Sequence, residues 1–196
     1  MKKLLSRTFI RQGKEYRVEI SLDVEALESK LSVAVTGAVR NQGDEEWDEV
    51  TYSAELDTEG EQIVVKYGDD DIASIPLHLP LSASDDPDLQ DAELEAEHSL
   101  IDSLLDASRF LKEPPVGVET ILEALPAPDP FLGCLLKGAV VTVAGQIIRC
   151  WKSLDRRRPI SYVMSHMSDC FQGHTWNMVT SFMWRSGRCM VLFGFG

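Results

Sequence analysis

Alternation of apolar and polar residues dominates the first part of the chain. Within residues 7–81, every second residue is apolar in four runs: Tyr16, Val18 and Ile20; Leu31, Val33 and Val35; Val50, Tyr52, Ala54 and Leu56; and Ile63, Val65 and Tyr67. Successive side chains of a strand point to opposite faces, so each run predicts a strand with one buried face. Turn residues, including Gly13, Gly43 and Gly68, separate the runs. The pattern predicts an antiparallel meander of about five strands.

Helical spacing replaces the alternation further along the chain. Residues 85–112 carry apolar side chains three or four positions apart, with acidic residues crowding the first half, where the helix dipole favours them. We expect a helix that covers the sheet, followed by a short helix at 118–125. The proline-rich segment 126–130 is typical of a stiff, extended linker. We therefore predict an acidic α+β domain at 1–125, a linker at 126–130 and a basic helical domain at 131–196.

The stretch 131–151 has the spacing of a helix with a buried face. Its apolar positions recur at steps of three or four, at Leu136, Val140, Val143, Ile147 and Trp151. The stretch is also about long enough to cross a bilayer, and basic residues follow it. A helix buried in a soluble tail and a membrane-associated helix are therefore both consistent with it.

Two further helices are expected in the tail. The spacing predicts one from Pro159 through Phe171, interrupted at Gly173, and another from Thr175 to Ser186, with Gly187 as its end. The last residues, 190–196, are apolar and fit a short strand or an inserted end. The chain as a whole is thus expected to be α+β, with an antiparallel β meander covered by a helix and followed by a C-terminal α-helical subdomain.

Charge divides the chain into two unlike parts. The net charge of −13 arises from 11 Lys and Arg against 30 Asp and Glu in residues 1–130, and 8 against 2 in residues 131–196. Phosphate contacts need a basic surface, so the front is not expected to bind nucleic acid. The opposite charges of the two parts predict that they dock on each other within the molecule.

All four cysteines, Cys134, Cys150, Cys170 and Cys189, lie in the last third of the chain. A helical hairpin centred near residue 160 would pair Cys134 with Cys189 and Cys150 with Cys170, although sequence leaves three connectivities open. Cys134 and Cys150 would face about 160° apart on a straight helix, so at least one is expected beyond a helix end. The N-terminus has no signal-peptide pattern, which predicts synthesis in the cytosol. Free thiols are expected there, and disulfides if the tail is exported or membrane-associated.

A metal or thiol site is a further hypothesis for the tail. His166, Cys170 and His174 recur every fourth residue, and Cys189 would be a fourth ligand for zinc or copper. Cys170 between two histidines would also suit a thiol nucleophile. The sequence contains no phosphate-binding loop of the type G-x-x-x-x-G-K-[ST], and no catalytic signature identifies an enzyme.

The tail also combines aromatic and cationic residues that suit contact with a membrane or a protein partner. These are Trp151, Arg156, Arg157, Arg158, Trp176 and Trp184. An acidic front followed by a basic, cysteine-containing tail resembles precursors of ribosomally made antimicrobial peptides that carry a leader or immunity part, although no double-glycine cleavage site precedes the tail.

Three functional hypotheses follow. The first is a nonenzymatic two-part protein whose acidic module holds a cationic amphipathic tail, as a precursor of a membrane-active antimicrobial peptide would. The second is a soluble regulatory or accessory binding protein, with the tail as its oligomer or partner interface. The third is a small metal-binding or thiol enzyme.

Overall fold

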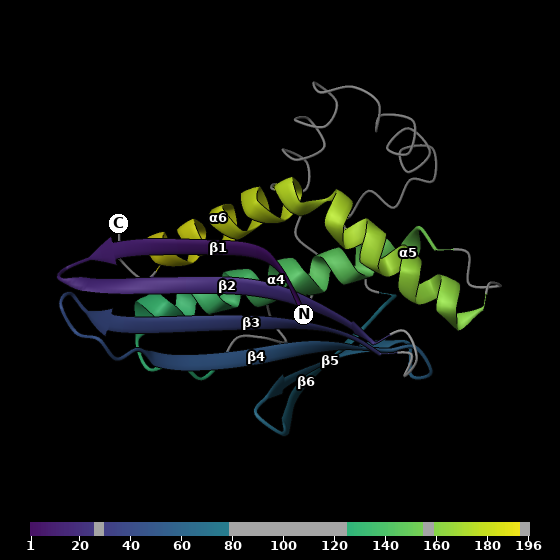
Figure 1. The fold of residues 1–196 in the computed structure, drawn as a ribbon, viewed down its shortest axis with the longest axis horizontal. Coiled ribbons are helices and arrows are strands. Elements are labelled where there is room, and N and C mark those ends of the chain that lie inside the picture. The colour runs from purple at the N-terminus through teal and green to yellow at the C-terminus, as the bar shows by residue number, and fades with distance from the viewer. Residues whose placement is uncertain (26–29, 79–124, 155–158, 193–196) are drawn as a thin grey trace.

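The computed structural model describes residues 1–25, 30–78, 125–154 and 159–192 (Figure 1). Within these ranges the chain forms a six-stranded sheet followed by three helices. The strands are β1 (Lys2–Arg11), β2 (Lys14–Glu25), β3 (Lys30–Asn41), β4 (Asp48–Asp57), β5 (Gln62–Tyr67) and β6 (Asp70–Pro76). The helices are α4 (Pro130–Lys152), α5 (Ile160–Gly173) and α6 (Thr175–Leu192). The predicted α+β fold, a meander followed by helices, is confirmed.

The sheet is a simple antiparallel meander, because each strand pairs with the next one along the chain. Turns that contain residues with positive φ join β1 to β2, β3 to β4, β4 to β5 and β5 to β6. Gln12 and Gly13, at φ 48° and 74°, close the two-residue turn between β1 and β2, as a type I′ turn requires. The sheet has one strand more than expected, and its first strand begins at Lys2 rather than near residue 7.

The inner face of the sheet forms one side of the hydrophobic core. Alternate residues of β2, β3 and β4 point to this face, and Val18, Val33 and Tyr52 on it have no exposed surface. Helix α4 packs on it, chiefly on β3 (Figure 1). One continuous core therefore joins the sheet to the helices.

The outer face of the sheet is polar and crossed by ion pairs. Arg17 Nη2 lies 2.5 Å from Glu49 Oε1, and Arg40 Nη2 lies 2.6 Å from Glu15 Oε2. Trp47 lies against both arginines, with their guanidinium carbons 4.6 and 4.3 Å from its ring centroid. This face presents charged groups to solvent, which is typical of an antiparallel sheet packed on one side only.

The tail helices begin close to where the sequence predicts, but the last one is longer. Helix α5 ends at Gly173, as expected. Helix α6 passes through Gly187 to Leu192, so the predicted end at Gly187 and a strand beginning at Met190 are wrong. Gly187 lacks the positive φ of a helix-ending glycine, and the helix continues through it.

Some predictions fall on residues that the structure does not describe. The helix expected at 85–112 and nearly all of that at 118–125 lie outside the described residues. The segment 126–130 is described, and its Asp129 and Pro130 form the start of α4. Whether 1–125 and 131–196 are separate domains stays a prediction.

Candidate functional site

Helix α4 is the centre of the candidate site, because it is buried on every side. Of its 23 residues, 18 are buried, from Phe131 through Trp151. By length and composition it is the one described helix that could cross a membrane, yet 89% of its most apolar 18-residue window is buried inside the protein. A helix that is apolar all round is typical either of a protein core or of a membrane span.

The sheet packs closely against α4 at Gly37 of β3. A Cβ atom built on Gly37 would lie 2.7 Å from Leu136 Cδ2 and 3.0 Å from Leu132 Cδ1. Glycine is therefore the residue that lets these two leucines sit against the strand. The contact between sheet and tail is apolar at this point, and docking through opposite charges stays a prediction.

The start of α4 is fixed to the sheet by polar contacts. Asp129 caps the helix by accepting hydrogen bonds from the backbone N–H groups of Phe131 and Leu132, and its Oδ2 lies 3.0 Å from Lys14 Nζ. Burial of Asp129 acts to raise its pKa, but the Lys14 ammonium and the two N–H donors outweigh that effect, so the pKa is lowered. The hydrogen bond to Asp129 is the main cause of the raised pKa of Lys14.

Tyr52 provides a second attachment just before α4. Its hydroxyl donates a hydrogen bond to the backbone carbonyl of Pro126. Burial is the main cause that raises the pKa of Tyr52 to about 12, so the hydroxyl stays protonated as a donor at ordinary pH. The linker that the sequence predicts is thus tied to β4.

The opposite side of α4 packs against α6 through small and polar residues. Gly138 lies against Ser186, and Thr142 Oγ1 donates to the Gly138 carbonyl at 2.7 Å. Ser181 Oγ lies 3.4 Å from Thr142 Oγ1 and accepts from Arg185 Nε at 3.0 Å. Small residues allow the two helix backbones to approach closely.

Two nested disulfides join α4 to the other two helices. Cys134 is bonded to Cys189 of α6 with a Cα–Cα distance of 5.5 Å, and Cys150 is bonded to Cys170 of α5 with a distance of 5.9 Å. This is the nested pairing suggested by the hairpin argument. The expectation that one of the α4 cysteines lies beyond a helix end is wrong, because Cys134 and Cys150 are bonded to different helices and both lie within α4.

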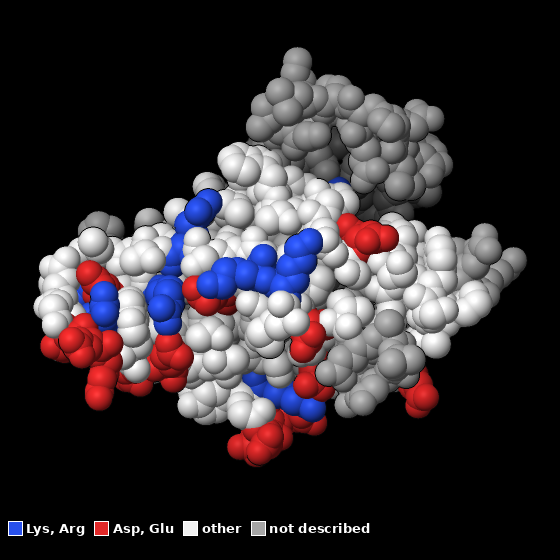
Figure 2. Space-filling view, in the orientation of Figure 1, with Lys and Arg blue, Asp and Glu red and all other residues white. Residues whose placement is uncertain are grey.

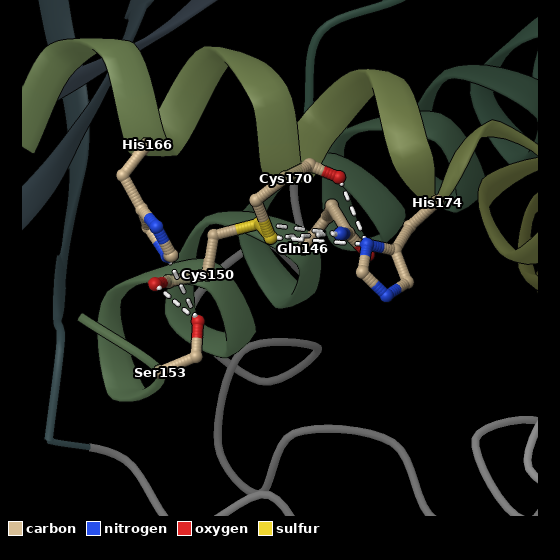
Figure 3. The surroundings of a disulfide bond; sticks show 6 residues. All are labelled: Gln146, Cys150, Ser153, His166, Cys170 and His174. Carbon is tan, nitrogen blue, oxygen red and sulfur yellow. Dashed lines mark hydrogen bonds between the residues drawn. A yellow bond between two sulfur atoms is a disulfide. The ribbon is translucent and has the colours of Figure 1, made fainter. Parts of the chain in front are cut away.

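Figure 3 shows the residues proposed as metal ligands around the Cys150–Cys170 disulfide. His166 points away from Cys170 toward Ser153, whose Oγ lies 3.2 Å from His166 Nε2. His174 Nδ1 lies 2.9 Å from the Cys170 carbonyl oxygen and 3.8 Å from its sulfur. A disulfide sulfur is not a thiolate, so Cys170 has neither a ligand nor a nucleophile to offer in this oxidised form.

Cys189, the proposed fourth ligand, is also in a disulfide. Among the described residues, no three His, Cys, Asp or Glu side chains are grouped so that they could hold a metal ion. The zinc or copper site and the thiol nucleophile remain sequence-based predictions that require reduced cysteines.

Sequence reasoning missed a buried amide beside the same disulfide. Gln146 has no exposed surface, and its Nε2 lies 3.3 Å from Cys150 Sγ and 3.9 Å from Cys170 Sγ (Figure 3). Its Oε1 has no hydrogen-bond partner among the described residues. In the sequence, Gln146 stands out only as a polar residue inside an apolar helical run, because its position against a disulfide depends on the fold.

The residues proposed to contact a membrane or a partner differ in their exposure to solvent. Trp151 is 5% exposed, so the folded chain does not offer it to a partner. Trp176 and Trp184 of α6 are 63% and 50% exposed. Arg156, Arg157 and Arg158 lie outside the described residues.

No protein-family model, no curated protein sequence and no solved structure matches the chain.

Proposed function

We propose that the chain is a nonenzymatic two-part protein, in which the N-terminal sheet covers a disulfide-linked helical tail and keeps α4 out of membranes until the tail is released. The tail comprises residues 131–196. Once released, it would act on an anionic membrane, as an antimicrobial peptide does. In the uncut chain, the acidic front would hold the cationic tail in an inactive form.

The observation that carries the proposal is that α4 is long and apolar enough to cross a membrane and is nevertheless buried inside the folded protein. Its 23 residues exceed the roughly 20 that a helix needs to cross the hydrocarbon core of a bilayer, and yet the sheet, α5 and α6 cover it. Contacts at Gly37 and Leu136 show how closely the sheet fits one side. Removing the sheet would expose that apolar side to water, and a bilayer offers it an alternative environment.

The disulfides support the idea that the tail acts as a unit. Each bond has one cysteine in α4 and the other in α5 or α6, so the three helices stay covalently connected when the sheet is gone. Disulfides persist in oxidising compartments, which favours a tail that leaves the cytosol. The positive charge of residues 131–196, with 8 basic and 2 acidic residues, favours anionic lipids over neutral ones.

A chain that can be cut at one site tests the proposal. A specific protease sequence is inserted between Pro114 and Pro115, outside the described residues, and the oxidised protein is mixed with anionic vesicles before and after cleavage. We expect the C-terminal fragment to stay with the vesicles through a high-salt wash, because inserted apolar surface is not released by screening. The N-terminal fragment is expected to remain in solution.

The uncut protein in the same wash is the matched control, and it should be removed from the vesicles. If both fragments stay together in solution after cleavage, or if the uncut chain resists the wash equally well, the sheet does not act as a cover for the tail and the proposal fails.

A further inference from the structure

The outer face of α6 carries a line of exposed apolar side chains. Trp176, Met183, Trp184 and Val191 are 63%, 45%, 50% and 72% exposed. Met183 and Trp184 are adjacent, and they follow Trp176 by seven and eight residues, close to two helical turns. Val191 follows Trp184 by seven more, so the four lie along one face. The other side of the helix is packed in the core, where Phe182 has no exposed surface. We name these four residues the α6 stripe.

Acidic residues are scarce in the two helices at the C-terminal end of the described chain. The sequence of α6 contains no Asp or Glu, and that of α5 contains one, the exposed Asp169. Tryptophan is favoured at the boundary between lipid and water, since its ring is apolar and its N–H remains hydrated. The stripe therefore has the composition of a surface that lies at a membrane interface.

Cationic side chains of β1 lie next to α6. The ring centroids of Phe9 in β1 and Phe182 in α6 are 6.3 Å apart, and Lys2 donates a hydrogen bond to Gln172 at the end of α5. Arg7 is exposed, and it shares a face of β1 with Phe9 because the two are two residues apart. Lys2 and Arg7 thus belong to the strand that packs beside α6.

The distribution of charge over the whole visible face agrees with this arrangement. In Figure 2, Lys and Arg side chains gather over β1 and β2, and the region of α6 above them is largely uncharged. Asp and Glu side chains are most numerous on the opposite side, toward β4 to β6 and the turns of the meander. A negatively charged surface would attract the first side and repel the second.

We propose that the intact chain binds the surface of an anionic lipid bilayer through the α6 stripe, with Lys2 and Arg7 beside it and α4 still covered. Helix α6 would lie in the plane of the interface, with its apolar stripe among the lipid headgroups and upper acyl chains. The inference goes beyond the proposed function, because it concerns the uncut chain and requires no release of the tail.

Charge favours a lipid surface over a second copy of the chain. A symmetric dimer formed through the stripe would bring the same surface of both copies together, and so would place their Lys2 and Arg7 side chains near one another. Like charges at such an interface are unfavourable, whereas anionic headgroups neutralise them.

Flotation of the uncut, oxidised protein with vesicles tests the inference. We expect binding to vesicles that contain phosphatidylglycerol, weaker binding to vesicles of phosphatidylcholine alone, and release by high salt, because screening weakens attraction between exposed charges. The variant Trp176→Ser/Trp184→Ser should bind at least about tenfold more weakly, since both indoles leave the interface. Both side chains are exposed, so its thermal unfolding should match that of the wild type.

Trp47→Ser is the matched control, because Trp47 lies on the outer face of the sheet between Arg17 and Arg40. It should keep full vesicle binding. The inference is overturned if the intact chain does not bind phosphatidylglycerol vesicles, or if Trp47→Ser weakens binding as much as the α6 double variant. It is also overturned if sedimentation shows that the stripe forms a dimer and vesicles do not compete with it. None of these results depends on cleavage, which separates them from the test of the covered tail.

Discussion

Gly138 of α4 lies so close to Ser186 of α6 that no methyl group fits between the two helices. A Cβ atom at position 138 would lie 2.4 Å from Ser186 Oγ and 2.9 Å from the Ser186 backbone nitrogen. The backbone of a packed helix cannot move away as the end of a flexible side chain can. The approach of α6 to α4 therefore depends on glycine at this position.

Replacement of Gly138 should separate the two helices at a measurable cost. We expect Gly138→Ala to lower the free energy of unfolding by about 1–3 kcal/mol, the usual effect of overpacking, as measured by urea denaturation. Gly187→Ala in α6 is the control, because nothing lies within 4 Å of a Cβ at that position. It should raise the stability by up to about 1 kcal/mol through helix propensity. Equal effects of the two substitutions would contradict the close contact.

The two disulfides should contribute unequally to stability. The Cys134–Cys189 bond spans 55 residues and the Cys150–Cys170 bond spans 20, and the longer loop restricts the unfolded chain more. We expect the Cys134→Ser/Cys189→Ser variant to lose about 4 kcal/mol and the Cys150→Ser/Cys170→Ser variant about 3 kcal/mol.

Mass analysis of proteolytic peptides without reduction checks the pairing itself. It should show peptides that contain Cys134 linked to those that contain Cys189, and Cys150 linked to Cys170. Peptides joining Cys134 to Cys150 would contradict the nested arrangement.

Asp129 should make the stability of the protein depend on acid pH. Its pKa in the folded protein is below the ordinary 3.8, so its contribution is present above that value and is lost as the pH falls through the folded pKa. At neutral pH, Asp129→Ala should cost about 1 kcal/mol through loss of the helix cap. Asp129→Asn keeps the cap and should lose less, and it should lack this component of the acid dependence. Denaturation curves at several pH values measure both effects.

The buried amide of Gln146 should be a cost rather than a source of stability. Because its Oε1 has no partner among the described residues, Gln146→Met should raise the free energy of unfolding by about 1 kcal/mol. Gln146→Glu would bury a charge and should lower it by about 3 kcal/mol or more. If Met destabilised the protein as much as Glu, the amide would be making a contact that this account does not contain.

The strands were predictable where their buried positions alternate. β4 shows this clearly, since Val50, Tyr52, Ala54 and Leu56 are buried and the residues between them are not. β1 was harder because it is an edge strand, and most of its side chains, including Arg7, are exposed. Only Leu5 of β1 is fully buried, so the strand has no run of alternating buried and exposed positions for the sequence to mark.

The candidate site was predictable in its parts but not in its arrangement. The spacing of the cysteines around residue 160 suggested the two pairs. The expectation that Cys134 or Cys150 lies beyond a helix end assumed that both pair with the same helix. Two partner helices on different sides make that unnecessary. Trp151 and Trp184 look alike in sequence, and only the packing shows that Trp151 belongs to the core and Trp184 to the surface.

The position of Trp151 relative to lipid tests the covered-helix account most directly. In a chain with the protease site, Trp47, Trp176 and Trp184 are replaced by Phe, so that Trp151 near the end of α4 is the only tryptophan. Vesicles contain anionic lipids brominated near the headgroup end of the acyl chain, which quench a tryptophan that enters the bilayer. The account predicts unquenched fluorescence in the uncut chain and strong quenching after cleavage. Trp151 that is quenched before cleavage, or that stays unquenched after it, would contradict the claim that the sheet keeps α4 from the membrane.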